Sequence, residues 1–308
     1  MKTFSEMENY CSQTFNNAGE PFWHLWTPEN HQVIFQDEDA FKAGTNILAI
    51  CSRLVPEVKI ITFQLMSNHL HQTLSGPREG VLKQFNLLKR YLGRYLKGRG
   101  LAVDLSQFEA NIRELTSLQE VRNVIVYNNR NGYVVSPDST PFTYPWGANG
   151  YYFNPLAKLR HSDSKSVLTK AQRRAIIHSH DSDKLKSPIN TVDDYACPMS
   201  FCCVEFGEAL FRCPSHYFRE ISRNIESQKE IAKELGERIF YSDDELFSII
   251  LSICKDNYDG QKPTLLPVSA KTELALNLHN DYNASNKQIQ RMLRLDAAIV
   301  DSLFPKKY

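Results

Sequence analysis

The stretch VKIITFQLMSNHLHQ, residues 58–72, decides the fold of the first part of the chain. Its opening residues, Val58 to Met66, are rich in apolar and β-branched side chains and predict a central strand. After a short Ser-Asn turn the chain continues as a partner strand. Side chains alternate along a strand, so His69 and His71 are expected on one face of it. Two imidazoles directed to one point favour a divalent metal ion; the alternative is two partly buried histidines that bond to backbone groups.

The segments around this hairpin predict an α+β fold. The expected elements are a strand at 21–27, a helix at 37–54 capped by Asp37, the partner strand at 69–74, a long amphipathic helix at 80–97, a helix from a capping box at 117–120 to about 129, and a short strand at 133–136 after Gly132. This order favours an antiparallel sheet with helices on one face, followed by a mainly α-helical C-terminal region.

Composition narrows the class of protein. The 308 residues include 36 basic and 35 acidic side chains, which argues against a globally basic nucleic-acid coat protein and leaves room for a local basic patch. No stretch approaches the roughly 20 apolar residues of a membrane span, and the start lacks the apolar core of a signal peptide. We therefore expect a cytoplasmic protein with no membrane partner.

A basic helix follows the hairpin. Between residues 81 and 103 there is no acidic residue, while Tyr91 and Tyr95 interleave with cations: Lys83, Lys89, Arg90, Arg94, Lys97 and Arg99. Basic and aromatic side chains together suit single-stranded DNA, through phosphate neutralisation and base stacking. The alternative is a solvated helix face whose leucines pack on the core.

The C-terminal region predicts a separate helical unit. We expect a first domain over 1–155, a helical extension over 156–262, and a helix-turn-helix-like unit over 263–308 with helices at 270–280, 287–293 and 295–303. Lys287 and Arg291 are its candidate DNA contacts, and a three-helix packing module without a DNA role is the alternative.

Three segments resemble a known family. Residues 63–71, an apolar strand followed by His69-Leu-His71, resemble the HUH strand of the single-tyrosine HUH transposases, although Ser67 stands where proline is usual. These enzymes mobilise the smallest bacterial insertion sequences and include the REP-associated tyrosine transposases. Residues 127–135 are similar to the helix end that carries the family's nucleophilic tyrosine, and residues 141–146 (PFTYPW) resemble an aromatic segment after it. The likeness covers roughly residues 20–150.

The resemblance implies a ferredoxin-like HUH domain that cleaves single-stranded DNA and transfers the strand. Tyr127 is then the nucleophile, which forms a 5′-phosphotyrosine link, and His69 and His71 bind Mg²⁺ or Mn²⁺ with Asn131 as third ligand. The implied partner is single-stranded or hairpin DNA, and the implied location is a nucleoid-associated one. Small relatives form dimers and longer ones act as monomers, so a homodimer is one assembly that the resemblance allows.

Alternatives stay open at this point. Aligning the family pattern on Gly132 places Asn123 at the position of the nucleophile, and Tyr91 and Tyr95 are weaker rivals of Tyr127. His24, on the first strand, would reach DNA or support the metal. Two rival functions share the fold: a domesticated, catalytically silent DNA-binding protein, and a replication or conjugation nicking enzyme.

Overall fold

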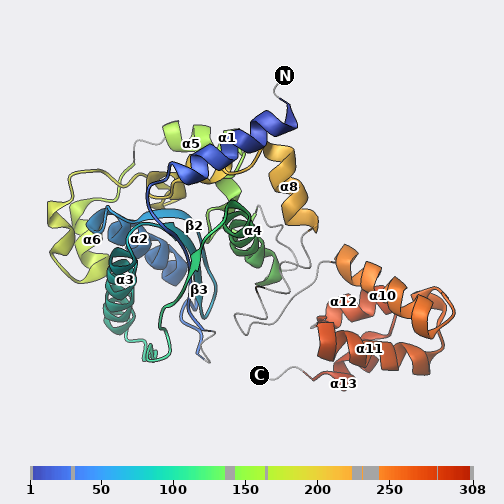
Figure 1. Ribbon diagram of the computed structural model, residues 1–308. Coiled ribbons are helices and arrows are strands. Elements are labelled where there is room, and N and C mark those ends of the chain that lie inside the picture. Colours follow the sequence, from blue (N-terminus) through green and yellow to red (C-terminus); the bar gives the residue numbers. More distant parts are fainter. Residues whose placement is uncertain are drawn as a thin grey trace. The chain divides into compact units, whose positions relative to one another are not determined.

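Figure 1 shows the computed structural model, which describes residues 3–28, 32–135, 143–163, 166–223, 231, 243–282 and 284–305. The chain divides into two compact units, 1–231 and 232–308. Residues 156–231 thus belong with the first unit, whereas the boundaries expected from the sequence fell after residues 155 and 262.

The first unit is built on one four-stranded antiparallel sheet, which confirms the α+β class. Its strands are β1 (Phe22–Trp26), β2 (Lys59–Leu65), β3 (Leu70–Ser75) and β4 (Asn111–Leu115), in the order β2-β3-β1-β4. The hairpin of β2 and β3 is the one predicted from residues 58–74. β3 and β1 are the central strands, and their register pairs Trp26 with His71 and His24 with Thr73.

Helices cover both faces of this sheet. The long helices are α2 (Glu38–Leu54), α3 (Arg78–Gly98) and α4 (Leu118–Val135). Thr73 of β3 accepts a hydrogen bond from Asn128 of α4, whereas Leu65, on the opposite face, lies against Gly44 of α2. α2 and α3 therefore share one face and α4 lies on the other (Figure 1). The expectation of helices on one face holds for α2 and α3 and is wrong for α4.

Helix starts follow the predicted caps. Asp37 accepts a hydrogen bond from the backbone N–H of Ala40, as an N-cap should. Ser117 and Glu120 form the expected capping box, with the Glu120 N–H bonded to Ser117 Oγ at 3.2 Å and the Ser117 N–H bonded to the Glu120 carboxylate at 3.1 Å.

The end of α4 differs from the sequence expectation. The helix runs through Gly132 to Val135, so the predicted stop at Gly132 and the predicted strand over 133–135 are wrong; residue 136 lies outside the described residues. An interior glycine costs a helix only about 1 kcal/mol. The packing of α4 along β2, β3 and β4 outweighs that cost.

The remaining segments of the first unit flank the sheet. They are α1 (Phe4–Asn16), η1 (Asn149–Tyr151), α5 (Pro155–Asp163), α6 (Lys170–Ile177), η2 (Asp181–Lys184), β5 (Thr191–Val192), β6 (Tyr195–Ala196), η3 (Pro198–Ser200), α7 (Val204–Ala209) and α8 (Pro214–Arg223). Part of this chain covers the edge strand β2: the Leu65 N–H donates to Trp146 O at 2.8 Å, and the Cys203 N–H donates to Ile60 O at 2.7 Å. These bonds satisfy backbone groups that would otherwise form an open edge.

The second unit is helical. It contains α10 (Asp243–Asn257), η4 (Pro263–Leu265), α11 (Val268–Tyr282), α12 (Asn286–Leu293) and α13 (Ala297–Leu303). Ser285 and Gln288 form a capping box at the start of α12, and the three predicted C-terminal helices are confirmed within two residues. Leu274, Ile289 and Val300 lie in its core. In the described part of the chain, no helix has the length and apolar character needed to cross a membrane.

Candidate active site

His69, His71 and Tyr127 meet on the sheet face that α4 covers. The rings of His69 and His71 have centroids 4.9 Å apart and an interplanar angle of 88°. The ring of Tyr127, from the middle of α4, stands edge-on to His71 with centroids 5.7 Å apart. His69 comes just before β3, and its carbonyl accepts a hydrogen bond from the Met66 N–H that closes the turn. The predicted histidine pair and the predicted tyrosine are therefore neighbours in space.

A third imidazole joins them. His24 of β1 lies on the same face, with its ring centroid 6.0 Å from that of His71 and 6.2 Å from that of Tyr127. We call His24, His69, His71 and Tyr127 the histidine–tyrosine cluster. The sequence suggested His24 only as a support, and the structure places it in direct contact with two members of the cluster.

The cluster is buried. His24 and His71 have no exposed surface, and His69 and Tyr127 are 7% and 5% exposed. Burial lowers the pKa of His71 to about 3. Burial, and then the neighbouring His71 and Arg113, hold the pKa of His24 well below its usual range. Both rings are therefore neutral at neutral pH, the form in which imidazole binds metal ions.

The spacing of His69 and His71 fits a shared metal ion. An ion bound to two imidazole nitrogens at roughly 2.1 Å holds the ring centroids about 5 Å apart, close to the 4.9 Å observed. Asn131 lies in α4 one turn after Tyr127, but its side chain is outside the described residues. In the described ranges, no group of three or more His, Cys, Asp or Glu side chains is arranged to hold an ion, so His24 does not complete a three-histidine set with His69 and His71. Two imidazoles would thus need oxygen ligands from an amide, water or substrate.

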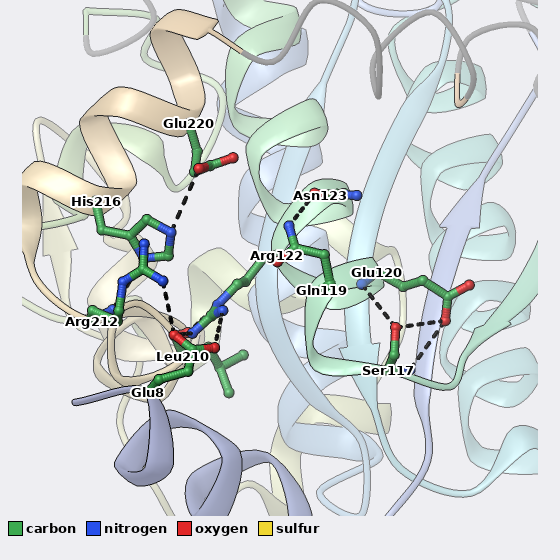
Figure 2. Close-up of polar contacts among 10 residues, drawn as sticks. All are labelled: Glu8, Ser117, Gln119, Glu120, Arg122, Asn123, Leu210, Arg212, His216 and Glu220. Carbon is green, nitrogen blue, oxygen red and sulfur yellow. Dashed lines mark hydrogen bonds and ion pairs between the residues drawn. The ribbon is translucent and has the colours of Figure 1, made fainter. Parts of the chain in front are cut away.

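The first half of α4 is fixed by a buried arginine. Arg122 is 3% exposed; its Nη1 donates to Glu8 Oε1 at 2.7 Å and its Nε donates to Leu210 O at 2.6 Å (Figure 2). Arg212 bonds the other Glu8 oxygen at 3.0 Å. These two guanidinium groups lower the pKa of Glu8, first through the hydrogen bond from Arg122. The helix that carries Tyr127 is therefore held by α1 on one side and by the segment before α8 on the other.

The alternative nucleophile positions, Asn123, Tyr91 and Tyr95, lie outside the histidine–tyrosine cluster. The Asn123 side chain accepts a hydrogen bond from Gln119 Nε2 at 2.8 Å, along the surface of α4 (Figure 2). Tyr91 and Tyr95 are on α3, across the sheet from the cluster. The Tyr91 hydroxyl donates to Asp181 at 2.6 Å, and the Tyr95 hydroxyl donates to Asp39 O at 3.3 Å. The ring contacts made by His24 and His71 therefore include Tyr127 and neither tyrosine of α3.

The predicted DNA-binding residues of the first unit do not surround the cluster. They lie on α3 and at its C-cap, Arg99, across the sheet. Three of them face carboxylates: Arg99 bonds Asp37 at 2.9 Å, Arg90 lies 3.4 Å from Asp181, and Lys83 lies 3.9 Å from Glu57. Lys89 is partly exposed, and Arg94 and Lys97 are exposed. Tyr91 is fully buried, so it is not placed to stack on a base. Lys287 and Arg291 are exposed on α12 in the second unit.

Arg113, a charged neighbour of the cluster, was not predicted from the sequence. Arg113 of β4 lies directly opposite His24 in the antiparallel register, on the face of β4 that α4 covers, and is half-buried. Its positive charge contributes to the lowered pKa of His24. No sequence signal pointed to it, because Asn111–Leu115 (NIREL) lacks the apolar run by which the other strands were found.

No protein-family model, curated protein or solved structure matches the chain.

Proposed function

We propose that this chain is a metal-dependent DNA strand transferase of the HUH type. The observation that carries the proposal is the contact of the Tyr127 ring with the His71 ring on one face of the sheet. The His71 ring centroid in turn lies 4.9 Å from that of His69. The element order β1-α2-β2-β3-α3-β4 and the strand order β2-β3-β1-β4 support a ferredoxin-like domain as its scaffold.

The proposed reaction is a transesterification. The Tyr127 hydroxyl oxygen attacks the phosphorus of a DNA phosphodiester and forms a phosphotyrosine bond to the 5′ phosphate of the downstream DNA fragment. The bond from phosphorus to the 3′ oxygen breaks, and that oxygen ends as a 3′-hydroxyl after it takes up the proton that the tyrosine lost. One ester replaces another, so rejoining the strand needs no ATP.

The other members of the cluster supply a site for the phosphate. His69 and His71 are the proposed metal ligands, with Asn131 as the third. A divalent ion bound there would polarise the scissile phosphate and stabilise charge on its oxygens. Arg113, beside His24, adds a fixed positive charge near the position that the phosphate would occupy.

Burial favours a second candidate function. His71 has no exposed surface and Tyr127 has only 5%, so a phosphate reaches the tyrosine oxygen only if covering groups move. A catalytically silent DNA-binding protein needs no such movement. In that case the cluster is a structural core, and DNA binding rests on cations such as Lys287 and Arg291.

A covalent-adduct assay separates the two candidates. The protein is incubated with single strands that carry inverted repeats from the DNA flanking its gene, in Mn²⁺ or Mg²⁺, and run on a denaturing gel. Strand transfer predicts an adduct that Tyr127→Phe and His69→Ala abolish and that Tyr95→Phe preserves. Stable DNA binding without any adduct supports the silent protein.

A further inference from the structure

A chain of buried hydrogen bonds, each donated in the same direction, ties the second half of α4 to Tyr217 and Asn149 in the region after the sheet. Thr62 Oγ1 of β2 donates to Asn129 Oδ1 at 2.5 Å, and Asn129 Nδ2 donates to the Tyr217 hydroxyl at 2.7 Å. The Tyr217 hydroxyl then donates to Asn149 Oδ1. All four side chains are at most 3% exposed. These hydrogen bonds therefore join β2, α4, α8 and η1 in the interior.

Tyr217 is the central link of this chain. Its hydroxyl accepts from α4 and donates to η1, so it satisfies a donor and an acceptor that are both shielded from water. Burial raises the pKa of Tyr217, which keeps the hydroxyl protonated and able to donate. Loss of the Tyr217 hydroxyl would leave buried polar groups on α4 and η1 without their partner, which is costly away from water.

The link acts close to the proposed nucleophile. Asn129 follows Tyr127 by two residues, and the residue between them, Asn128, donates to Thr73 Oγ1 of β3 at 3.0 Å. Successive side chains of an α-helix point about 100° apart. Bonds from Asn128 to β3 and from Asn129 to β2 and α8 therefore fix the rotation of α4 about its own axis, and with it the direction in which Tyr127 points.

We propose that Tyr217 is a positioning residue for Tyr127: through Asn129 it holds α4 at the rotation that presents the tyrosine to His71. The inference rests on the proposed strand-transfer function. It gives the segment after the sheet, residues 143–223, a part in the site: this segment supplies both Tyr217 and Asn149, without touching the reacting atoms.

Tyr152 of the same protein provides a matched control for Tyr217. This tyrosine is 1% exposed, its ring stacks on Tyr217 with centroids 5.3 Å apart, and its hydroxyl donates to the backbone carbonyl of Ile61 at 2.9 Å. Tyr152→Phe thus removes one buried hydroxyl from the same neighbourhood but breaks no bond to α4. Tyr217→Phe and Tyr152→Phe differ chiefly in that bond.

The first experiment measures single-turnover adduct formation over a range of DNA concentrations. Tyr217→Phe should lower the maximal rate at least tenfold and leave the half-saturating DNA concentration unchanged, while Tyr152→Phe keeps the rate within twofold of the parent. Thr62→Val breaks the same chain from the sheet side and should repeat the rate loss if Tyr217→Phe folds poorly. Parental rates in Tyr217→Phe and Thr62→Val, or an equal loss in Tyr152→Phe, overturn the inference.

The second experiment reads the position of Tyr127 without DNA, so it decides the inference even if the parent protein forms no adduct. 3-Fluorotyrosine is incorporated at position 127 and its ¹⁹F resonance is recorded. We expect one sharp resonance in the parent and in Tyr152→Phe, and a shifted or broadened one in Tyr217→Phe. An identical resonance in all three proteins contradicts a positioning role. Absence of an adduct from the parent bears on the proposed function alone.

Discussion

The ring of Tyr127 stands edge-on to the imidazole of His71, with centroids 5.7 Å apart and an interplanar angle of 84°. Residues separated by 56 positions of sequence are brought together because β3 and α4 pack face to face. This contact joins the two halves of the proposed site, the metal-binding pair and the nucleophile.

Removal of His71 should weaken metal binding at the proposed site. His71→Ala takes away one of two imidazoles, and we expect Mn²⁺ affinity, measured by calorimetry, to fall by at least roughly tenfold. His180→Ala is the control, since His180 belongs to a second His-x-His sequence, His178-Ser-His180, and its side chain is 79% exposed. Equal Mn²⁺ affinity of His71→Ala and the parent protein would exclude His71 as a ligand.

Arg122 should be a major contributor to stability. Arg122→Ala removes the bonds to Glu8 and to the Leu210 carbonyl from a side chain that is 3% exposed. We expect the free energy of unfolding, from urea titration, to drop by about 3 kcal/mol.

Arg160→Ala provides the comparison for Arg122→Ala. Arg160 pairs with Asp193 at 3.0 Å, but both side chains are 65% exposed. The free energy of unfolding should therefore change by less than about 1 kcal/mol. Equal losses in the two variants would show that the buried Arg122 bonds add no more than a surface pair.

Mild acid should destabilise the protein partly through His216. Burial, and then the charges of Arg212 and Arg122, lower the pKa of His216 to about 4. The unfolded chain takes up a proton near pH 6.5, whereas the folded chain does so only near pH 4, so stability falls as the pH drops between these values. From pH 7 to pH 5 the loss is about 1–2 kcal/mol. Unfolding of His216→Asn should be less sensitive to pH over this range, and equal slopes would contradict the assignment.

The cations of α12 should contribute to binding of duplex DNA. Lys287 and Arg291 are both exposed and lie one turn apart on the same side of the helix. If both neutralise phosphates, Lys287→Gln with Arg291→Gln lowers the slope of log affinity against log salt by about 2. Fluorescence anisotropy in the full chain measures this slope, with Lys255→Gln and Lys262→Gln as the control for lost charge in the same unit. An unchanged slope would favour a packing module.

Local patterns were sufficient to predict the hairpin and its flanking elements. The β-branched run at 59–65 and the apolar residues at helical spacing over 38–54 reflect which side of each element is buried. The predicted bounds of this strand and this helix are confirmed within two residues. β4 was missed because NIREL, at the sheet edge, carries alternating polar residues and only one buried side chain. The end of α4 was wrong because a glycine was read as a stop where tertiary packing continues the helix.

The surroundings of the site depend on contacts between distant parts of the chain. Arg113 reaches His24 only through the pairing of β1 with β4, and Tyr217 reaches Asn129 across 88 positions of sequence. No local period encodes such contacts. The sequence therefore indicated His69, His71 and Tyr127 but did not reveal what holds them.

The central claim is that Tyr127 attacks DNA within a site formed by His69 and His71. Its most direct test is mass spectrometry of the protein after incubation with a hairpin-bearing single strand from the DNA flanking its gene, in Mn²⁺. We predict a DNA fragment linked through its 5′ phosphate to the peptide that contains Tyr127, and no link in Tyr127→Phe. A DNA link at another residue, or an undiminished link in Tyr127→Phe, would contradict the account.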